Sequence, residues 1–212
     1  MHLYDNKEDW KKLSLYANRL DAISVREKSV QYRIEETGYF GPCKTVLDPT
    51  LLLKKEEWIN YESTEIKYEE DFVLVYSLKE KEKCCDLANK IASKKNFRIV
   101  DISPISICEN SEWVLDCAPA DFLYYVHHSK YVVTDSFHGT VFSIVYNKQF
   151  VSVAAEKSKD SRIVNLLKSL GLECCISYNF KNLIQIEYDQ VNILIEKMKE
   201  QSINYIVSAL EE

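Results

Sequence analysis

The sequence predicts an α/β protein with a Rossmann-like, doubly wound parallel sheet. From about residue 72 onward, short apolar runs rich in β-branched residues alternate with segments of helical periodicity, as βαβ units do. One of these runs, Tyr131–Thr134, leads directly into a polar turn and a further helical segment. Strands of parallel sheets commonly end in this way, and helices then cover both faces of the sheet.

The first part of the chain predicts only a portion of such a domain. The expected elements are a helix at Trp10–Leu20, a strand at Ala22–Val25, a helix at Glu27–Thr37 closed by Gly38, and a short strand at Val46 and Leu47. Two strands are fewer than the five or six that complete a Rossmann-like domain. Residues 1–55 are therefore expected to be the C-terminal part of an incomplete N-terminal Rossmann-like domain, and the acidic residues 56–70 a linker.

Residues 71–188 predict a second Rossmann-like domain that carries the polar turn. Its expected strands are Phe72–Tyr76, Arg98–Val100, Tyr131–Thr134 and Phe150–Val153. Its expected helices are Lys81–Lys94, Ala120–Ser129, Thr140–Tyr146 and Arg162–Leu170. Residues 189–212 are expected to form a closing C-terminal helix, because apolar residues recur there at mostly helical spacing.

The composition of the chain argues against several classes of function. Hydrophobic residues make up 46% and charged residues 28% of 212 residues, which is typical of a globular chain with a buried core. The net charge of −6 and the scattered Lys and Arg residues argue against nucleic acid as a partner. No run approaches the roughly 18 apolar residues of a membrane span, so none is expected. Seven cysteines without a Cys-x-x-Cys pair predict reduced thiols and a cytoplasmic location.

The polar turn after Tyr131–Thr134 is the most informative part of the chain. Gly139 has no Cβ, so a ligand can approach its backbone closely. The N–H groups from Thr140 onward are expected to begin a helix, whose positive end attracts an anion. His138 would then lie beside that anion as a side chain that gives or takes a proton near neutral pH.

Other segments, taken in order with this turn, match a known pattern. They are Ile23–Glu27, Leu47–Leu52, Pro119–Leu123, Tyr131–Ile144, Ser161–Ile163, Leu166 with Leu167, and Leu170–Leu172. Together they resemble the polysaccharide pyruvyl transferase family, and the resemblance covers most of the chain. It implies two facing Rossmann-like domains in a GT-B-like arrangement, of which this chain would be the C-terminal portion.

The resemblance also implies a reaction. A pyruvyl group passes from phosphoenolpyruvate to a sugar of a growing exopolysaccharide or other cell-surface glycan, or to a lipid-linked sugar. The products are a pyruvate ketal on the sugar and free phosphate. Such a transferase must bind a phosphate and a carboxylate, for which Arg side chains and N–H groups are suited. It also needs an acid to protonate the methylene carbon of the donor and a base for the sugar hydroxyl.

His138 is the first candidate, as general acid or as a hydrogen-bond donor to phosphate. The plain alternative is a core histidine bonded to a carbonyl, but its place at a strand tip favours the functional role. Many family members have Arg-Leu-His-Gly where this chain has Ser136, Phe137, His138 and Gly139. The chain therefore lacks one donor-binding cation of the pattern, and Ser136, Gly139 and Thr140 are expected to contact the donor from this turn.

Three charged residues are further candidates. Arg26, after the first strand, could bind the donor or form a surface ion pair with Glu27 or another neighbour. Arg162, in the first turn of a helix capped by Ser161, is electrostatically misplaced unless an anion is near, which makes it a second donor-binding candidate. Asp135 could be the catalytic base or could bond backbone amides in its own turn. The acidic residues and histidines lack metal-ligand spacing, so neither a metal nor a cofactor beyond the donor substrate is expected.

Two other functions stay open at this point. A GT-B-like architecture also serves glycosyltransferases that use a nucleotide sugar, because fold alone does not fix function. The other open function is that of a truncated, non-catalytic module that binds an anion or a partner protein. Such a fragment could bury its apolar surface by forming a homo-oligomer.

Overall fold

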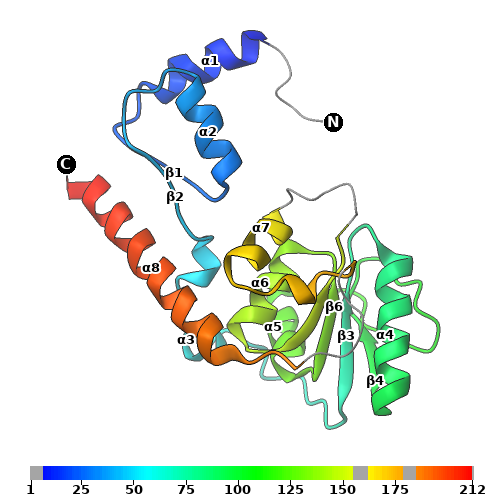
Figure 1. Cartoon of the computed structure of the whole chain (residues 1–212). Coiled ribbons are helices and arrows are strands. Elements are labelled where there is room, and N and C mark those ends of the chain that lie inside the picture. The colour runs from blue at the N-terminus through cyan, green and yellow to red at the C-terminus, as the bar shows by residue number, and fades with distance from the viewer. Residues whose placement is uncertain (1–6, 155–161, 179–184, 212) are drawn as a thin grey trace. The chain divides into compact units, whose positions relative to one another are not determined.

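The protein is described by a computed structural model that covers residues 7–154, 162–178 and 185–211. The chain divides into two compact units (Figure 1). Unit 1 comprises residues 1–52 and 193–212, and unit 2 comprises residues 53–192. The C-terminal helix α8, Tyr188–Glu211, contributes to both units.

Unit 2 is built on a parallel five-stranded sheet in the order β5-β4-β3-β6-β7. Its strands are β3 (Phe72–Tyr76), β4 (Arg98–Asp101), β5 (Glu112–Trp113), β6 (Tyr131–Thr134) and β7 (Gln149–Ser152). This sheet confirms the predicted Rossmann-like α/β class. The four long strands were located from the sequence within one residue, and β5 was missed because it has only two residues, both of them exposed.

Helices cover both faces of this sheet, with α4 (Lys81–Lys95) on one face and α5 (Pro119–His128) and α6 (Phe137–Val145) on the other (Figure 1). A further helix, α7, spans Arg162–Ser169. Alternating side chains of the strands serve the two faces, since successive residues of a strand point in opposite directions. The core beneath α4 contains Val73, Val75, Ile99, Val133, Val151, Ala88 and Ile91.

The opposite face of the sheet has an aromatic core. Phe72 of β3 packs edge-on against Tyr125 of α5, with ring centroids 6.2 Å apart. Phe122 of α5 lies between Tyr76 of β3 and Phe142 of α6, at 5.2 and 5.6 Å. Edge-to-face pairs of this kind stabilise a core beyond the apolar area that they bury. They hold α5 and α6 against this face of the sheet.

Unit 1 contains a two-stranded parallel sheet of β1 (Ile23–Val25) and β2 (Cys43–Thr45), with α1 (Lys7–Ala17) and α2 (Lys28–Glu36). A small core of Ala17, Ile34 and Tyr39 holds it together. The C-terminal part of α8 bonds to the same unit. Its Tyr205 hydroxyl lies 2.8 Å from the carbonyl oxygens of both Ile23 and Pro42.

Four elements differ from the prediction. The helix expected at Trp10–Leu20 is α1, which lies three residues earlier at Lys7–Ala17. The second strand of unit 1 is Cys43–Thr45 instead of Val46 and Leu47. The expected linker over residues 56–70 contains most of the helix α3 (Lys55–Ile59), which packs on α5. Trp58 of α3 lies 4.9 Å from the Phe142 ring, so an apolar anchor holds this acidic stretch on unit 2. Finally, α6 begins at Phe137, three residues before the predicted start, because Ser136 caps it.

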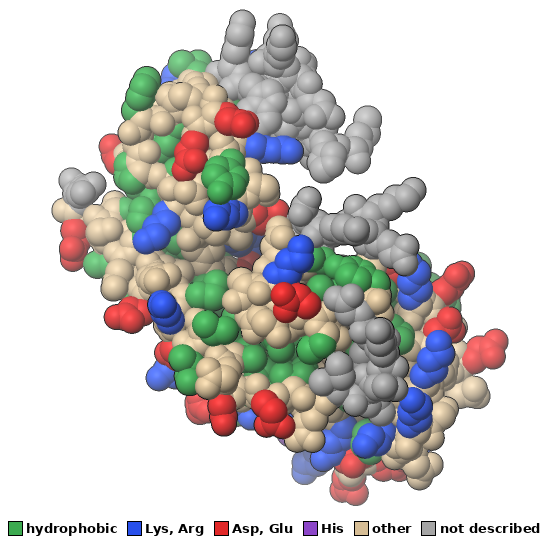
Figure 2. Space-filling model, viewed as in Figure 1, with side chains coloured by type: hydrophobic (Ala, Val, Ile, Leu, Met, Phe, Trp, Pro, Cys, Tyr) green, Lys and Arg blue, Asp and Glu red, His purple; other side chains and the backbone are tan. Residues whose placement is uncertain are grey.

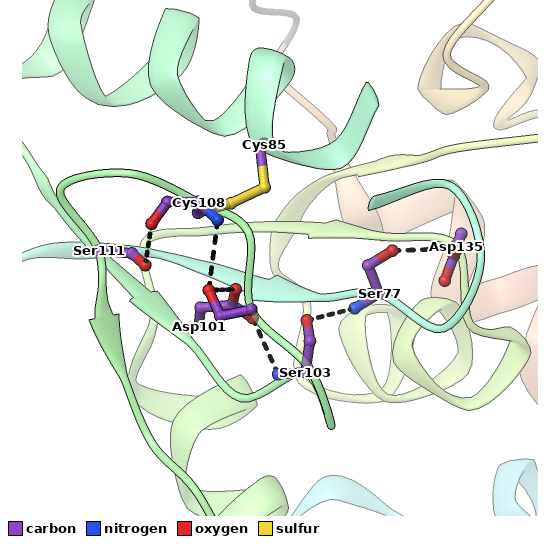
Figure 3. The surroundings of a disulfide bond; sticks show 8 residues. Ser77, Cys85, Asp101, Ser103, Cys108, Ser111 and Asp135 are labelled. Carbon is purple, nitrogen blue, oxygen red and sulfur yellow. Dashed lines mark hydrogen bonds between the residues drawn. A yellow bond between two sulfur atoms is a disulfide. The ribbon is translucent and has the colours of Figure 1, made fainter. Parts of the chain in front are cut away.

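The expectation that all thiols are reduced is wrong for one pair. Cys85 of α4 and Cys108, in the segment between β4 and β5, form a disulfide with Cα atoms 5.2 Å apart (Figure 3). This pair was not predictable from the sequence, because the two residues are 23 positions apart and share no motif. Five other cysteines are free, and Cys84 and Cys175 are buried among them. The disulfide ties the long helix of unit 2 to the segment that leads to the edge strand.

The surface of the described residues is mixed in charge. Lys and Arg side chains lie among Asp and Glu side chains over the visible face, and the described ones drawn there form no continuous basic stripe (Figure 2). Across the ranges that the structure covers, no helix combines the length and the apolar character needed to cross a membrane.

Candidate functional site

The sheet of unit 2 has a topological switch point between β3 and β6. The chain moves from β3 to β4 on one side and later returns to β6 on the other side of β3. The loops that follow β3 and β6 therefore diverge at the carboxyl edge of the sheet, where open α/β sheets bind their ligands. A hollow of about 300 Å³ lies at this edge. Its lining residues include Lys79, Asp135, Phe137, Ala154 and Arg162.

Asp135 organises the loop that follows β3. Its carboxylate accepts hydrogen bonds from the backbone N–H groups of Leu78, Lys79 and Glu80 at 2.7, 2.6 and 2.5 Å. The Ser77 hydroxyl adds a fourth bond at 3.1 Å (Figure 3). A sugar hydroxyl would have to displace one of these donors to reach the carboxylate. The geometry thus favours the structural alternative for Asp135 over the role of catalytic base.

A chain of buried hydroxyl groups extends this network across the sheet. The N–H of Ser77 donates to Ser103 Oγ at 2.9 Å, and the N–H of Ser103 donates to Asp101 Oδ1 at 2.8 Å (Figure 3). Asp101, at the end of β4, is 1% exposed. Buried polar groups that are satisfied in this way hold their loops in one conformation. The loops at the carboxyl edge are therefore fixed by side chains from three neighbouring strand ends.

The turn after β6 uses three of the predicted donor-binding residues internally. Ser136 Oγ accepts from the N–H of Gly139 at 3.3 Å, and the Thr140 N–H and hydroxyl both bond to Ser136 O at 3.0 Å. A Cβ at Gly139 would lie 2.3 Å from Thr134 Oγ1. The glycine therefore permits α6 to pack on β6, and ligand approach is not what requires it. The expected donor contacts of Ser136 and of the Thr140 N–H are taken by these bonds.

Two hydrogen-bond donors remain for an anion, and they belong to the two residues before Gly139. The backbone N–H groups of Phe137 and His138, the first two of α6, bond to no acceptor among the described residues. These amides also lie at the positive end of the helix. The His138 side chain is exposed and makes no hydrogen bond or ion pair within the described ranges. Its ring contacts Phe137 edge-on with centroids 5.6 Å apart, so it is not a core histidine.

Arg162 is the predicted cation that lies at this hollow. Its guanidinium carbon lies 5.0 Å from the centroid of the Phe137 ring, a cation–π distance. Lys79, from the loop after β3, lines the same hollow and was missed by the sequence analysis. Its position directly after the apolar run Phe72–Tyr76 is the signal that could have identified it. The predicted cap Ser161 lies outside the described residues.

Arg26 belongs to unit 1 and forms an ion pair there. Its Nη1 lies 2.6 Å from Asp48 Oδ2. The other carboxylate oxygen, Asp48 Oδ1, accepts bonds from the N–H and hydroxyl of Thr50 at 3.1 and 2.7 Å. Burial raises the pKa of Asp48, but the bonds from Thr50 and Arg26 outweigh it and leave the pKa below its ordinary value. Of the two readings for Arg26, the ion pair with a neighbour is therefore the one that the structure contains.

The spacing of acidic residues and histidines predicted no metal site. Within the described ranges, one group of side chains has ligand atoms close enough to share an ion: Glu62, His127 and His128, whose atoms lie within 4.8 Å of one another. They lie at the amino edge of the sheet, because α5 ends at His128 directly before β6 begins. The candidate site at the carboxyl edge of the sheet thus contains His138, Arg162, Lys79 and two helix amides. The group of Glu62, His127 and His128 is separate from that site.

Comparison with known protein families gives a match. A family model described as polysaccharide pyruvyl transferase matches residues 3–156. The matched segment includes unit 1 up to Leu52 and most of unit 2, with the turn that carries His138. No curated protein matches the chain at a significant level.

Proposed function

The chain belongs to the polysaccharide pyruvyl transferase family, and from this premise we propose that it transfers a pyruvyl group from phosphoenolpyruvate to a sugar of a cell-surface polysaccharide precursor. The donor would bind at the carboxyl edge of the unit 2 sheet. The observation that carries the proposal is the hollow lined by Lys79 and Arg162 at the start of α6. That first turn carries the exposed imidazole of His138 and two amides that bond to no acceptor among the described residues.

The chemistry of the donor fits these groups. Phosphoenolpyruvate carries a phosphate and a carboxylate on a three-carbon skeleton, and a hollow of about 300 Å³ is the size of a small-ligand pocket. The amides of Phe137 and His138 suit a phosphate at the start of a helix. The planar guanidinium of Arg162 suits the carboxylate, and Lys79 adds a point charge at the same hollow.

His138 is assigned the proton transfers. Its imidazolium gives a proton to the methylene carbon of the donor, and the central carbon becomes electrophilic as the double bond is lost. A sugar hydroxyl oxygen bonds to that carbon and gives its proton to the neutral imidazole. The carbon–oxygen bond to phosphate then breaks, and a second hydroxyl oxygen bonds to the same carbon and closes the ketal while its proton passes to the departing phosphate. Asp135 contributes by holding the loop over residues 78–80 instead of acting as the base.

Release of inorganic phosphate from phosphoenolpyruvate, measured with and without a panel of glycan acceptors, tests the proposal. Acceptor-dependent release is expected from the full chain. His138→Gln keeps a polar side chain but cannot shuttle the proton, so kcat should fall by about 10²–10⁴-fold. Arg162→Ala should raise KM for phosphoenolpyruvate. The matched control is Lys168→Ala, at the other end of α7, which should leave KM unchanged.

Ligand protection against thermal unfolding separates this function from a nucleotide-sugar transferase. Phosphoenolpyruvate should raise the unfolding midpoint, because a ligand that binds only the native state stabilises it. If nucleotide sugars raised the midpoint and phosphoenolpyruvate did not, the chain would be a glycosyltransferase. A folded chain that binds phosphoenolpyruvate without ever releasing phosphate would be a binding module.

A further inference from the structure

A second polar cluster lies at the amino edge of the unit 2 sheet, away from the candidate site. It consists of Glu62, His127 and His128, which we call the Glu–His–His cluster. Glu62 follows helix α3, and the two histidines are the last residues of helix α5. A backbone bond of 3.1 Å from the Ser63 N–H to the Ala120 carbonyl holds the two segments together. The cluster is thus built by two elements whose positions are fixed.

The spacing of its ligand atoms is that of a metal site. Glu62 Oε1 lies 2.9 Å from His127 Nδ1, and Glu62 Oε2 lies 3.5 Å from His128 Nε2. Tetrahedral zinc, with bonds of about 2.0–2.2 Å, places its ligands roughly 3.3 Å from one another. The carboxylate and the two imidazoles could therefore bind one ion after small rotations of the side chains.

Both imidazole rings are held by aromatic neighbours. His127 stacks on Tyr146 with ring centroids 4.7 Å apart and an interplanar angle of 16°. His128 stacks on Tyr124 at 4.1 Å and 21°. Rings that are packed in this way lose little freedom when they bind an ion. Such neighbours orient metal ligands in the same manner as the outer hydrogen bonds of known sites.

Two buried oxygen atoms of this region lack a hydrogen-bond partner among the described residues: Glu62 Oε1 and Tyr146 Oη. The side chain of Glu62 is 8% exposed, and its Oε1 is near His127 Nδ1 without the alignment of a hydrogen bond. The hydrogen bond from Nδ1 goes to the other oxygen, Oε2, at 3.2 Å. Tyr146 interacts with the Glu62 carboxylate, but neither Glu62 Oε1 nor Tyr146 Oη has a well-aligned hydrogen bond among the described residues, so Oε1 can serve as a ligand to an ion.

The charges around the cluster set the type of ion. Glu62 supplies the one negative charge of the cluster. Two cations oppose a bound metal: Lys148, whose Nζ donates to the His127 carbonyl oxygen at 2.5 Å, and Lys55 at the start of α3. The two lysines would repel an ion that is bound by electrostatic attraction alone. An ion that forms strong coordinate bonds to imidazole nitrogen would bind despite this repulsion. Zn²⁺ and its neighbours in the first transition row are such ions.

We propose that Glu62, His127 and His128 bind a divalent transition-metal ion, with zinc the best match, and that this ion ties the segment after α3 to the end of α5. Two imidazoles and one carboxylate form a donor set that zinc takes in proteins, with the fourth position left to solvent. His128 is half-exposed, with 43% of its side chain accessible, so solvent can reach the ion. The ion would act on the stability of unit 2, since it binds at the sheet edge opposite the polar turn.

Cobalt is a probe that reports both binding and ligand type. The full chain, treated with chelator and dialysed, should bind one equivalent of Co²⁺, with weak visible absorption bands typical of nitrogen and oxygen ligands. Zn²⁺ should displace the cobalt and should raise the thermal midpoint of the metal-free chain. A strong near-ultraviolet band would show that the ion is bound by the free cysteines instead, and it would overturn the proposal.

Two variants locate the ion. Glu62→Gln preserves the shape of the side chain and removes its charge, and His128→Ala removes a half-exposed ligand outside the core. Each should weaken Co²⁺ binding at least tenfold and abolish the zinc-dependent rise in midpoint. His138→Ala is the matched control, an exposed histidine outside the cluster, and should bind as the parent does. Equal binding by all three variants, or no binding by the parent chain, would leave an ordinary ion pair and refute the metal site.

Discussion

The contact of Gly139 with Thr134 yields the sharpest prediction about the fold of the site. In Gly139→Ala the new Cβ would lie 2.3 Å from Thr134 Oγ1 and 3.0 Å from Thr134 Cβ and Cγ2. Thr134 is fully buried and cannot swing away, because its Oγ1 donates to Tyr76 O at 2.6 Å and accepts from Ser136 N–H at 3.0 Å. The substitution must either displace α6 or break both bonds.

The expected loss of stability follows from these contacts. Forcing an extra methyl group into a packed interior costs about 1–3 kcal/mol. Disturbing two buried hydrogen bonds adds about 1 kcal/mol each, and the better helix propensity of Ala returns about 1 kcal/mol. We expect Gly139→Ala to lower the free energy of unfolding of unit 2 by about 2–4 kcal/mol. The α6 amides that are proposed to bind phosphate should shift with the helix.

Urea unfolding followed by tryptophan fluorescence measures this loss. Trp58 reports on α6 directly, because it packs on Phe142 of that helix with ring centroids 4.9 Å apart. Thr134→Ala removes the colliding hydroxyl and methyl groups, so the double variant should be more stable than the sum of the two single effects by about 1–2 kcal/mol. Additive effects, or a neutral Gly139→Ala, would refute the packing role of the glycine.

Three further predictions concern the polar and covalent contacts. Asp135→Ala leaves the bonded loop amides without an acceptor, so the free energy of unfolding should fall by about 2–3 kcal/mol and hydrogen exchange over residues 78–80 should accelerate; unchanged exchange would argue against the loop-holding role. Asp48→Asn keeps a capping side chain but loses the charge that pairs with the half-exposed Arg26, at a cost of about 1 kcal/mol near neutral pH. The pKa of Asp48 is lowered from 3.8, so this stabilisation is present above that pH and is lost as the pH falls through the folded-state pKa. Hydrogen exchange over residues 43–52 should therefore differ between parent and variant near neutral pH and become equal in acid. Cys85→Ala opens the loop of 23 residues between Cys85 and Cys108 and should lower the free energy of unfolding by about 3 kcal/mol. A reducing agent should lower the stability of the parent to that of the variant and leave the stability of the variant unchanged.

The sequence predicted those features that depend on local pattern. The apolar runs Phe72–Tyr76 and Tyr131–Thr134 became the two central strands, because no polar residue interrupts them and parallel strands are buried on both faces. The exposed position of His138 at the tip of β6 followed from the same pattern. The start of α6 was mistaken since Gly139 suggested a turn, whereas Ser136 caps the helix three residues earlier.

Features that need distant residues were not predictable in this way. The bonds of Asp135 go to amides 55–57 positions earlier, and Glu62 meets His127 across 65 positions. Lys79 shares the hollow with Arg162 only because β3 and β6 are neighbours in the sheet. No local spacing encodes these contacts, which arise from strand order.

Amide chemical-shift mapping during a titration with phosphoenolpyruvate tests the proposed site most directly. We expect the largest shifts at the N–H groups of Phe137 and His138 and smaller ones over residues 78–80, and we expect Arg162→Ala to weaken the binding. Inorganic phosphate should shift the same two amides at higher concentration. If phosphoenolpyruvate shifted other amides of the chain and left these two unchanged, the donor site at the carboxyl edge of the sheet would be contradicted.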